Sequence, residues 1–446
     1  MMTLSAAAKI MNAQLTGKDQ VFTSVCTDSR SIATGALFVA LKGDRFDGHD
    51  FVEQSRSHGA TGALVDHFID THQSCIRADN TLTGLQQLAA TWRSRFTGRV
   101  IGVTGSNGKT TVKEMVGAIL SKFASTLISE GNLNNHIGVP LSLLRLNQSH
   151  RFAVIEMGMN HSGELTTLTE MVRPDIAIIT NAAEAHLEGL GSVDRVAKAK
   201  AEIFLGLKDG VGVICGDDPF APYWQSQLGA NKCRTFGLES GNDLQASVEY
   251  TENASTIDFD YKGRTLSVRL GIAGKHNVLN ALAAITVAEL LDINSDCVVS
   301  GLESFQPVKG RGQTLSVLGK VLIDDSYNAN PASLNAAIEV LSQYKGCKML
   351  VLGDMGELGA DAAEFHSSAG LAAKHAGVDI LLTVGPLSKH AAIAFGEPQH
   401  AFTDMEELIG EVKKRFSRID VMLVKASRSM RMERLVNTII NMEEVA

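Results

Sequence analysis

The chain has 446 residues, too long for a single core, so two or three domains are expected. A hydrophobic content of 44%, a charged content of 20% and a net charge of −8 describe an ordinary globular protein and argue against nucleic acid as its main partner. The six cysteines are scattered and form no C-x-x-C pair, which predicts reduced thiols. The sequence shows no signal peptide and no apolar run long enough to span a membrane, so we expect a cytoplasmic protein.

The first unit is expected over residues 1–81, as a small mixed α/β domain with one helix at 49–57. Its short strands are predicted at residues 21–26, 36–41 and 63–65. A helix over 82–96 then leads into the next unit.

A Gly-rich turn next joins a short apolar strand to an amphipathic helix. Gly105 and Gly108 let the backbone approach a ligand, and the helix start directs N–H groups and the positive end of its dipole at one point, which suits a polyphosphate. Lys109 can reach the β- and γ-phosphates, and the Thr110 hydroxyl can coordinate Mg²⁺. Val103 stands where the standard phosphate loop has Gly, so this loop is a variant.

The second unit, residues 82–308, alternates strands and helices, which predicts a mainly parallel sheet with helices on both faces. Its apolar strands are expected at residues 153–157, 176–180 and 211–215. Short alternating strands over 245–270 predict a small antiparallel patch, and a helix follows at 278–291.

The third unit, residues 309–446, is expected to be a second nucleotide-binding type of α/β sheet. Four strands, each followed by a helix, are predicted at residues 321–325, 349–353, 380–384 and 421–424. The segment 307–312 is interpreted as the linker and hinge that enters this unit.

Polar residues just past the parallel strands are the candidates for chemistry, because ligands bind beyond the carboxyl ends of such strands. Glu156 ends an apolar strand and could ligate Mg²⁺, or it could be a carboxylate exposed at a strand end. His186 follows the next strand and could bind a metal or a phosphate, or be an ordinary loop histidine. Asp325 could bind a ribose or a phosphate-linked group, with a turn-forming Asn/Pro cluster as the alternative.

Lys200 lies on an amphipathic helix, where most lysines are solvated. A buried lysine near other cations can instead lose its proton, and a neutral amine can react with CO₂ to form a carbamate. Such a carbamate would offer oxygen ligands to Mg²⁺.

The run 104–110, without the leading Gly, is similar to the loop of the Mur ligase superfamily, and further landmarks follow in that family's order. They are the run 131–135, Glu156, His186, Lys200, the run 274–280, Arg311 and Asp325. The runs 27–30 and 38–43 look like the uridine-binding domain of its later-acting members. The run 325–331 resembles the member that adds D-alanyl-D-alanine, and the Asp-Asn-Pro-Arg signature of the member that adds the third amino acid does not occur.

The resemblance implies three domains: an N-terminal domain for the UDP substrate, a central ATPase-type parallel sheet and a C-terminal Rossmann-like domain for nucleotide and D-Ala-D-Ala. It implies an ATP-dependent ligase that adds D-Ala-D-Ala to UDP-MurNAc-tripeptide through an acyl phosphate, a cytoplasmic step of peptidoglycan precursor synthesis. We expect a monomer that uses ATP and two Mg²⁺ ions.

The resemblance also assigns roles to residues. ATP would contact Gly105, Ser106, Asn107, Gly108, Lys109, Thr110, Thr111, Asn277, Asn280, Arg311 and Asp325. Thr110 and Glu156 would hold a first Mg²⁺, and His186 with carbamylated Lys200 a second; Lys109, His186 and Lys200 are the catalytic candidates. The substrate-binding candidates are Ser29, Lys42 and His49 for the uridine diphosphate end, and Asn135, Tyr327, Asn328 and Asn330 for the rest.

Two other interpretations stay open at this point. The chain could be a different ligase of the same superfamily, adding diaminopimelate or lysine, or a folylpolyglutamate synthase. From another class, it could be a phosphate-loop NTPase or kinase that acts as a switch. The run 325–331 and the uridine-type first domain count against the other ligases.

Overall fold

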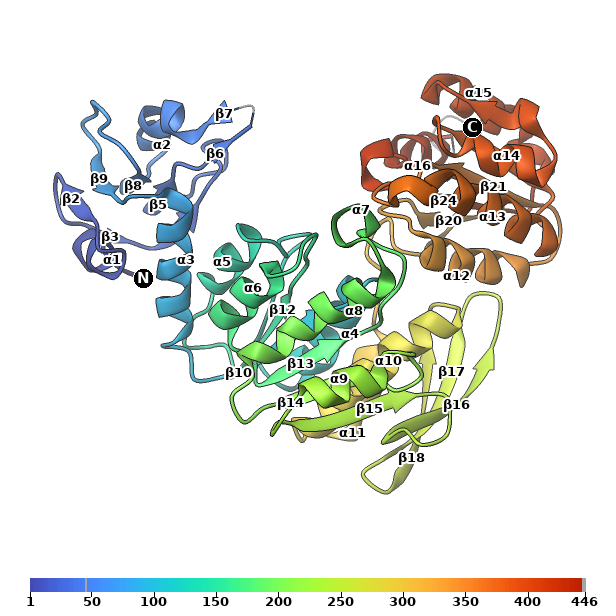
Figure 1. Ribbon diagram of the computed structural model, residues 1–446, viewed down its shortest axis with the longest axis horizontal. Helices are drawn as coiled ribbons and strands as arrows, with labels where there is room; N and C mark the ends of the chain where they lie inside the picture. The colour runs from blue at the N-terminus through green and yellow to red at the C-terminus, as the bar shows by residue number, and fades with distance from the viewer. Residues whose placement is uncertain (45, 443–446) are drawn as a thin grey trace.

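The computed structural model describes residues 1–44 and 46–442. Three sheets follow one another along the chain, with five, nine and six strands, and two further strand pairs accompany the first. In Figure 1 the N-terminal unit (blue) and the C-terminal unit (orange to red) stand on opposite sides of the central unit (green to yellow). The expected α/β class is confirmed.

The first unit is built on a five-stranded sheet that is parallel except at one edge. In spatial order its strands are β2 (Gln14–Thr16), β9 (Ser74–Arg77), β8 (Gly62–Val65), β5 (Ala36–Val39) and β4 (Ser24–Cys26). The short pairs are β1 (Met2–Thr3) with β3 (Val21–Phe22), and β6 (Lys42–Gly43) with β7 (Phe46–Asp47). Its helices are α1 (Leu4–Ile10), η1 (Gly48–Phe51) and α2 (Val52–Ser57). The strand predicted at 21–26 is therefore divided into β3 and β4, and β9 was not predicted.

The central unit has a nine-stranded sheet that is parallel from β11 to β16 and antiparallel from β16 to β18. In spatial order the strands are β11 (Thr126–Ile128), β12 (Phe152–Glu156), β10 (Arg99–Thr104), β13 (Ile176–Ile179), β14 (Val211–Cys215), β15 (Lys232–Gly237), β16 (Leu244–Tyr250), β17 (Ser255–Tyr261) and β18 (Arg264–Leu270). The antiparallel patch expected at 245–270 is confirmed, and it continues the parallel sheet.

Alternating residues of these strands enter two separate apolar clusters, one on each face of the sheet. One face is covered by α3 (Thr81–Arg93), α5 (Gly138–Leu143), α6 (Glu164–Val172), α8 (Val193–Ala201) and α9 (Ala221–Gln227). The other face is covered by α4 (Lys109–Phe123), α10 (Lys275–Leu290) and α11 (Ser295–Glu303). The short segments α7 (Leu187–Leu190) and η2 (Glu202–Gly206) complete the unit.

The C-terminal unit is a six-stranded sheet, parallel except for its first strand. In spatial order the strands are β19 (Gln313–Val317), β20 (Lys320–Asp325), β24 (Val421–Lys425), β21 (Lys348–Gly353), β22 (Ile380–Val384) and β23 (Ala401–Phe402). One face packs on α12 (Pro331–Ser342), α13 (Ala362–His375) and α14 (Lys389–Phe395), and the other on α15 (Met405–Arg415) and α16 (Glu433–Ile440). Single 3₁₀ turns are η3 (Gly359–Asp361), η4 (Pro398–His400), η5 (Phe416–Arg418) and η6 (Arg428–Met430).

The strand register brings the candidate residues of the central unit to one edge of its sheet. β10 lies between β12 and β13, and both neighbours are parallel to it. Val103 pairs with Glu156, and Thr104 pairs with Ile179. The phosphate loop therefore begins beside Glu156 and beside the residues that follow β13, as expected at the carboxyl edge of a parallel sheet.

Within the described residues, no helix combines the length and the apolar character that crossing a membrane requires. All six cysteines are free thiols.

Candidate active site

A cavity of about 950 Å³ lies between the central and C-terminal units. Its walls include most of the residues that the sequence singled out, from both units. These are Ser106, Asn107, Gly108, Lys109, Thr111, Asn135, Glu156, His186, Asn277, Asn280, Arg311, Asp325, Tyr327, Asn328 and Asn330. The carboxyl edge of the central sheet and that of the C-terminal sheet thus share one space.

Both glycines of the phosphate loop are required by close packing. Gly105 has a φ of +152°, and a Cβ at this position would overlap the Thr180 hydroxyl. Gly108 has a φ of +80°, and a Cβ there would overlap the Asn280 side chain. The loop backbone can therefore run close to the end of β13 and to α10 only because these two positions carry no side chain.

Lys109, the first residue of α4, folds back over the phosphate loop. Its ammonium donates to the carbonyl oxygens of Gly105 and Ser106, at 2.6 and 3.0 Å. Burial lowers the pKa of Lys109 to about 8; the charge of Glu156 opposes this shift and that of Arg311 adds to it. The positive charge is thus held directly over the backbone that is expected to cradle phosphates.

Glu156 is 2% exposed and stands at the centre of a polar cluster. Its two carboxylate oxygens accept hydrogen bonds of 2.8 Å, one from the Thr110 hydroxyl and one from the Asn134 amide. The Lys113 ammonium lies 3.9 Å away. A carboxylate and a hydroxyl side by side are oxygen ligands of the kind that Mg²⁺ prefers, so this pair fits the predicted first metal site.

His186 and Lys200 occupy different environments. His186 lies on the cavity wall, with its Nδ1 at 2.7 Å from Glu357 Oε2 of the C-terminal unit, although this ion-pair contact does not meet hydrogen-bond geometry. Lys200 is 1% exposed and, within the described part of the chain, is not among the residues that line the cavity. Burial, followed by the positive charge of Lys109, lowers the pKa of Lys200 well below its usual value. The lowered pKa makes the neutral amine, the form that reacts with CO₂, more accessible at Lys200 than at an exposed lysine.

The wall contributed by the C-terminal unit begins at the end of β20. Of the two consecutive acids, Asp324 is fully buried and accepts from the backbone N–H and hydroxyl of Ser326, so its role is structural. Asp325 faces the cavity and forms a 2.5 Å ion pair with Lys425, which also donates to the Asn328 carbonyl at 3.1 Å. Burial raises the pKa of Asp325, and the charge of Lys425 opposes that shift.

Tyr327 and Asn330 extend this wall toward the phosphate loop. Two guanidinium groups lie over the Tyr327 ring, those of Arg311 at 4.0 Å and Arg428 at 5.8 Å from its centroid. Asn330 caps α12 and exchanges two side-chain hydrogen bonds with Asn107, at 2.7 and 3.3 Å. The phosphate loop and the polar run of the third unit are thus in direct contact.

Sequence reasoning missed several of these side chains. Asn134 contacts Glu156, whereas Asn135 accepts from the N–H groups at the start of α5, so the structure brings Asn134 to the predicted metal site. Lys113 is fully buried and donates to the Ser129 carbonyl at 2.7 Å. A lysine one turn after Lys109, on the apolar side of an amphipathic helix, was a signal that could have identified it.

The candidates for the uridine diphosphate end are not brought to this cavity, within the described residues. Ser29 donates to the Gln54 side chain at 3.2 Å, and Lys42 lies 3.6 Å from Asp47. His49 is buried, with its ring between Asp47 and Asp66. Their role in binding a substrate stays a prediction.

The cavity combines a phosphate loop with a carboxylate–hydroxyl pair, and a second α/β unit closes it. These features define the class of protein, which is a nucleotide-dependent enzyme built from three α/β units. Three family models match consecutive parts of the chain: "Mur ligase family, catalytic domain" over residues 21–87, "Mur ligase middle domain" over 103–288 and "Mur ligase, glutamate ligase domain" over 310–428. The chain belongs to the Mur ligase family.

Individual relatives resemble the chain over nearly its whole length. The UDP-N-acetylmuramoyl-tripeptide–D-alanyl-D-alanine ligase of Escherichia coli (strain K12) is 41% identical over 443 residues, which is 98% of each chain. A crystal structure of MurF from Acinetobacter baumannii has a TM-score of 0.91 at 34% identity, with 99% of each chain covered. The MurF ligase from Thermotoga maritima, solved in complex with ADP, has a TM-score of 0.82 at 28% identity and covers 95% of this chain and 98% of its own.

Proposed function

We propose that the protein is an ATP-dependent ligase that joins the amino group of D-alanyl-D-alanine to the terminal carboxylate of UDP-MurNAc-tripeptide. The observation that carries this proposal is the direct contact between Asn107 of the phosphate loop and Asn330 of the 325–331 run, across one cavity. This contact supports a site for ATP beside the run whose sequence resembles the D-Ala-D-Ala-adding member of the family. The full-length similarity to ligases with this printed activity supports the same assignment.

The proposed reaction has two steps, because a carboxylate is a poor electrophile. A carboxylate oxygen of the tripeptide attacks the γ-phosphorus of ATP, the bond to the bridging oxygen breaks, and ADP leaves. The dipeptide amine then attacks the acyl phosphate carbon, loses a proton, and phosphate leaves as the amide forms. Lys109 would neutralise negative charge on the γ-phosphate, and water must be excluded, since it would hydrolyse the acyl phosphate.

Thr110 and Glu156 would hold Mg²⁺, since their oxygens lie together beside the phosphate loop. The ion would neutralise charge on the phosphates when bound. Asn134 would orient Glu156 through its hydrogen bond to Oε1.

We infer in addition that Lys200 reacts with CO₂: its neutral amine nitrogen bonds to the carbon, and a proton leaves, giving a carbamate. Its burial and lowered pKa support this step. The carbamate and His186 would hold the second Mg²⁺. The negative carbamate would also attract the Lys109 ammonium, whereas a protonated Lys200 would be repelled by it.

The remaining assignments are proposals of the same kind. ATP would contact Asn277, Asn280, Arg311 and Asp325 besides the phosphate loop, and Tyr327, Asn328, Asn330 and Asn135 would meet the acceptor and donor substrates. We propose domains at residues 1–81, 82–308 and 309–446, with a hinge at 307–312, where Gly310 and Gly312 both have positive φ. A monomer in the cytoplasm is expected.

The test is to measure phosphate release from ATP with each substrate omitted in turn. The proposal requires that release and amide formation both depend on UDP-MurNAc-tripeptide and on D-Ala-D-Ala. Phosphate release that is independent of the dipeptide and is not accompanied by amide formation would favour an NTPase switch and contradict the ligase assignment. Addition of a single amino acid to an acceptor that lacks the third residue would favour another ligase of the family.

A further inference from the structure

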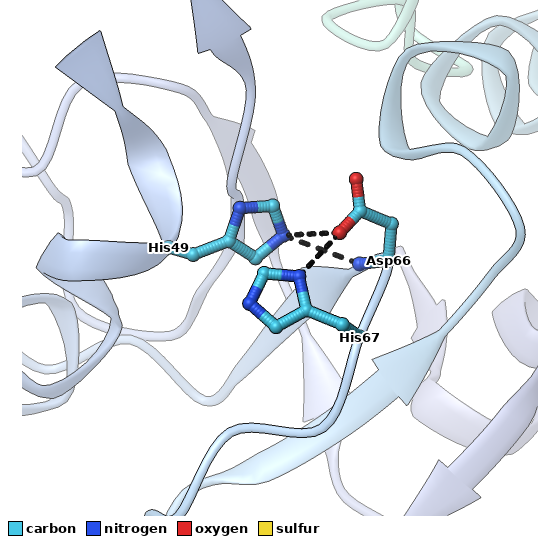
Figure 2. A group of neighbouring side chains, drawn as sticks. All are labelled: His49, Asp66 and His67. Carbon is cyan, nitrogen blue, oxygen red and sulfur yellow. Dashed lines mark hydrogen bonds and ion pairs between the residues drawn. The ribbon is translucent and has the colours of Figure 1, made fainter.

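A group of three potential metal ligands lies in the N-terminal unit, apart from the cavity described above. His49 belongs to η1, and Asp66 and His67 directly follow β8. Figure 2 shows the two imidazole rings side by side, each with a nitrogen directed at the Asp66 carboxylate. None of the steps proposed for the ligase reaction uses Asp66 or His67.

The ligand atoms are already close together. Asp66 Oδ1 lies 3.1 Å from His49 Nε2 and 2.6 Å from His67 Nδ1, and the three ligand atoms are all within 4.8 Å of one another. Ligand bonds of about 2.0–2.2 Å in a tetrahedral zinc site correspond to a spacing of roughly 3.3 Å between ligand atoms. The His67 side chain is 55% exposed, so it has the freedom to widen the shorter spacing by the small amount required.

His49 is held in the orientation that a metal ligand needs. The Asp66 backbone N–H donates to Nε2 at 3.2 Å, so Nε2 is the unprotonated ring nitrogen, and a metal ion would take over its lone pair from this hydrogen bond. The opposite ring nitrogen, Nδ1, lies 2.5 Å from Asp47 Oδ1, which accepts its proton. A histidine whose second nitrogen donates to a carboxylate is the usual arrangement behind a ligating imidazole, because it fixes the tautomer and raises the basicity of the ligand nitrogen.

We propose that His49, Asp66 and His67 form a binding site for a divalent transition metal of the zinc type, with Asp47 as its positioning residue. Two imidazoles and one carboxylate favour such an ion over Mg²⁺ or Ca²⁺, which prefer oxygen ligands throughout. The exposed side of His67 leaves the fourth coordination position open to water or to an oxygen of a bound ligand. Metal binding would replace the 2.6 Å contact between His67 Nδ1 and Asp66 Oδ1 and requires both atoms to be unprotonated.

The test is a titration of the full, metal-free chain with Zn²⁺ by calorimetry, without ATP or substrates, so that its outcome does not depend on the ligase assignment. Co²⁺ replaces Zn²⁺ in a parallel titration, because its visible absorption reports protein ligands. One equivalent is expected to bind. His67→Ala should weaken binding by more than about 100-fold, and Asp47→Asn by about 10- to 100-fold, the usual cost of losing an outer partner.

The chain offers two matched controls. His72→Ala removes an exposed histidine of the same unit, and Glu156→Gln alters the proposed magnesium site; neither should change the stoichiometry or the affinity for Zn²⁺. The proposal is overturned if the unaltered chain binds no Zn²⁺, if His67→Ala binds it equally well, or if His72→Ala loses binding to the same extent. In the first case the three side chains form only a hydrogen-bonded network around Asp66.

Discussion

Replacing Gly105 by alanine should abolish tight nucleotide binding while leaving the fold intact. The added Cβ would overlap the Thr180 hydroxyl and lie 3.0 Å from Thr180 Cβ and 3.2 Å from its backbone nitrogen. Thr180 cannot turn away freely, because its hydroxyl donates to the Asn107 carbonyl at 2.5 Å and holds the phosphate loop in place. The loop itself must therefore move, and it lies at the cavity surface where movement is possible.

The magnitude follows from three contributions. Holding a non-glycine residue in a sparsely populated backbone region costs roughly 1–3 kcal/mol. Overpacking costs a further 1–3 kcal/mol or so, and the lost hydrogen bond about 1 kcal/mol. In the free protein a relaxed loop avoids most of this cost, but binding phosphates requires the original loop. An effect of at least about 3 kcal/mol corresponds to a loss of 100-fold or more in affinity for ATP.

Calorimetric titration with ATP measures this loss, and circular dichroism checks the fold. Gly229→Ala is the matched control: Gly229 also has a positive φ, of +59°, but no atom lies within 4 Å of its added Cβ, so affinity should not change. The double variant Gly105→Ala/Thr180→Ala removes the overlapping hydroxyl and should recover part of the affinity. The reasoning is refuted if Gly105→Ala binds ATP within twofold of the unaltered protein, or if the double variant is no better than the single one.

Three further predictions concern the charged groups. Because burial lowers the pKa of Lys109 to about 8, its charge is present below that pH and is lost above it, so affinity for ATP should fall as the pH rises through 8. Lys109→Arg stays protonated and should remove this fall; a flat profile in the unaltered protein would contradict the assignment. Lys200→Ala should lose ligase activity and regain part of it with added short-chain carboxylic acids, whereas Lys198→Ala, on the exposed side of the same helix, should stay active. Full activity of Lys200→Ala would exclude a carbamate. Glu156→Gln should raise the Mg²⁺ concentration for half-maximal activity by about tenfold or more; an unchanged Mg²⁺ requirement would remove Glu156 from the metal site.

The strands that carry the site could be predicted because they are continuous apolar runs. β14 and β22 begin and end at the predicted residues, β13 ends one residue earlier than predicted, and β12 begins and ends one residue earlier than predicted. Parallel strands covered on both faces produce such runs. A polar residue that interrupts the pattern, such as Glu156, was therefore visible as a candidate.

The strands that were missed lack that signal. β15 (Lys232–Gly237) contains Lys, Cys, Arg and Thr, and its first three residues are not fully buried, so it shows no apolar run. β19 (Gln313–Val317) lies at the edge of its sheet, and every second residue in it is polar and exposed. Both are strands because a neighbouring strand supplies hydrogen-bond partners, which the local sequence does not reveal.

Contacts between units were beyond sequence reasoning for a different reason. Asn107 and Asn330 are 223 positions apart, and their pairing depends on how two complete units are placed. The same holds for Asn134, which was indistinguishable from its neighbours Asn132 and Asn135 in the sequence but is the one whose amide reaches Glu156. Residue type limited the candidates, and only the packing of whole elements selected among them.

The packing between units also favours one kind of domain motion. The apolar cluster that holds Leu37 and Leu64 of the N-terminal unit also contains Leu88 of α3, so the N-terminal unit is anchored to the central unit by a shared core. Within the described residues, the apolar clusters of the C-terminal unit contain no residue of the central unit, and the direct contacts include the polar pairs Asn107–Asn330 and His186–Glu357.

Moving the N-terminal unit away from α3 would expose buried leucines, at about 1.5–3 kcal/mol for each side chain. Moving the C-terminal unit exchanges polar contacts for water, at a net cost of about 1 kcal/mol per hydrogen bond. Closure about residues 307–312 is therefore the motion with the lower cost, and the C-terminal unit is the part we expect to move. Distances between spin labels on the three units, measured with and without ADP, test this expectation. Closure of the C-terminal unit changes the distance between the central and C-terminal labels, whereas a motion of the N-terminal unit would change the distance between the central and N-terminal labels instead.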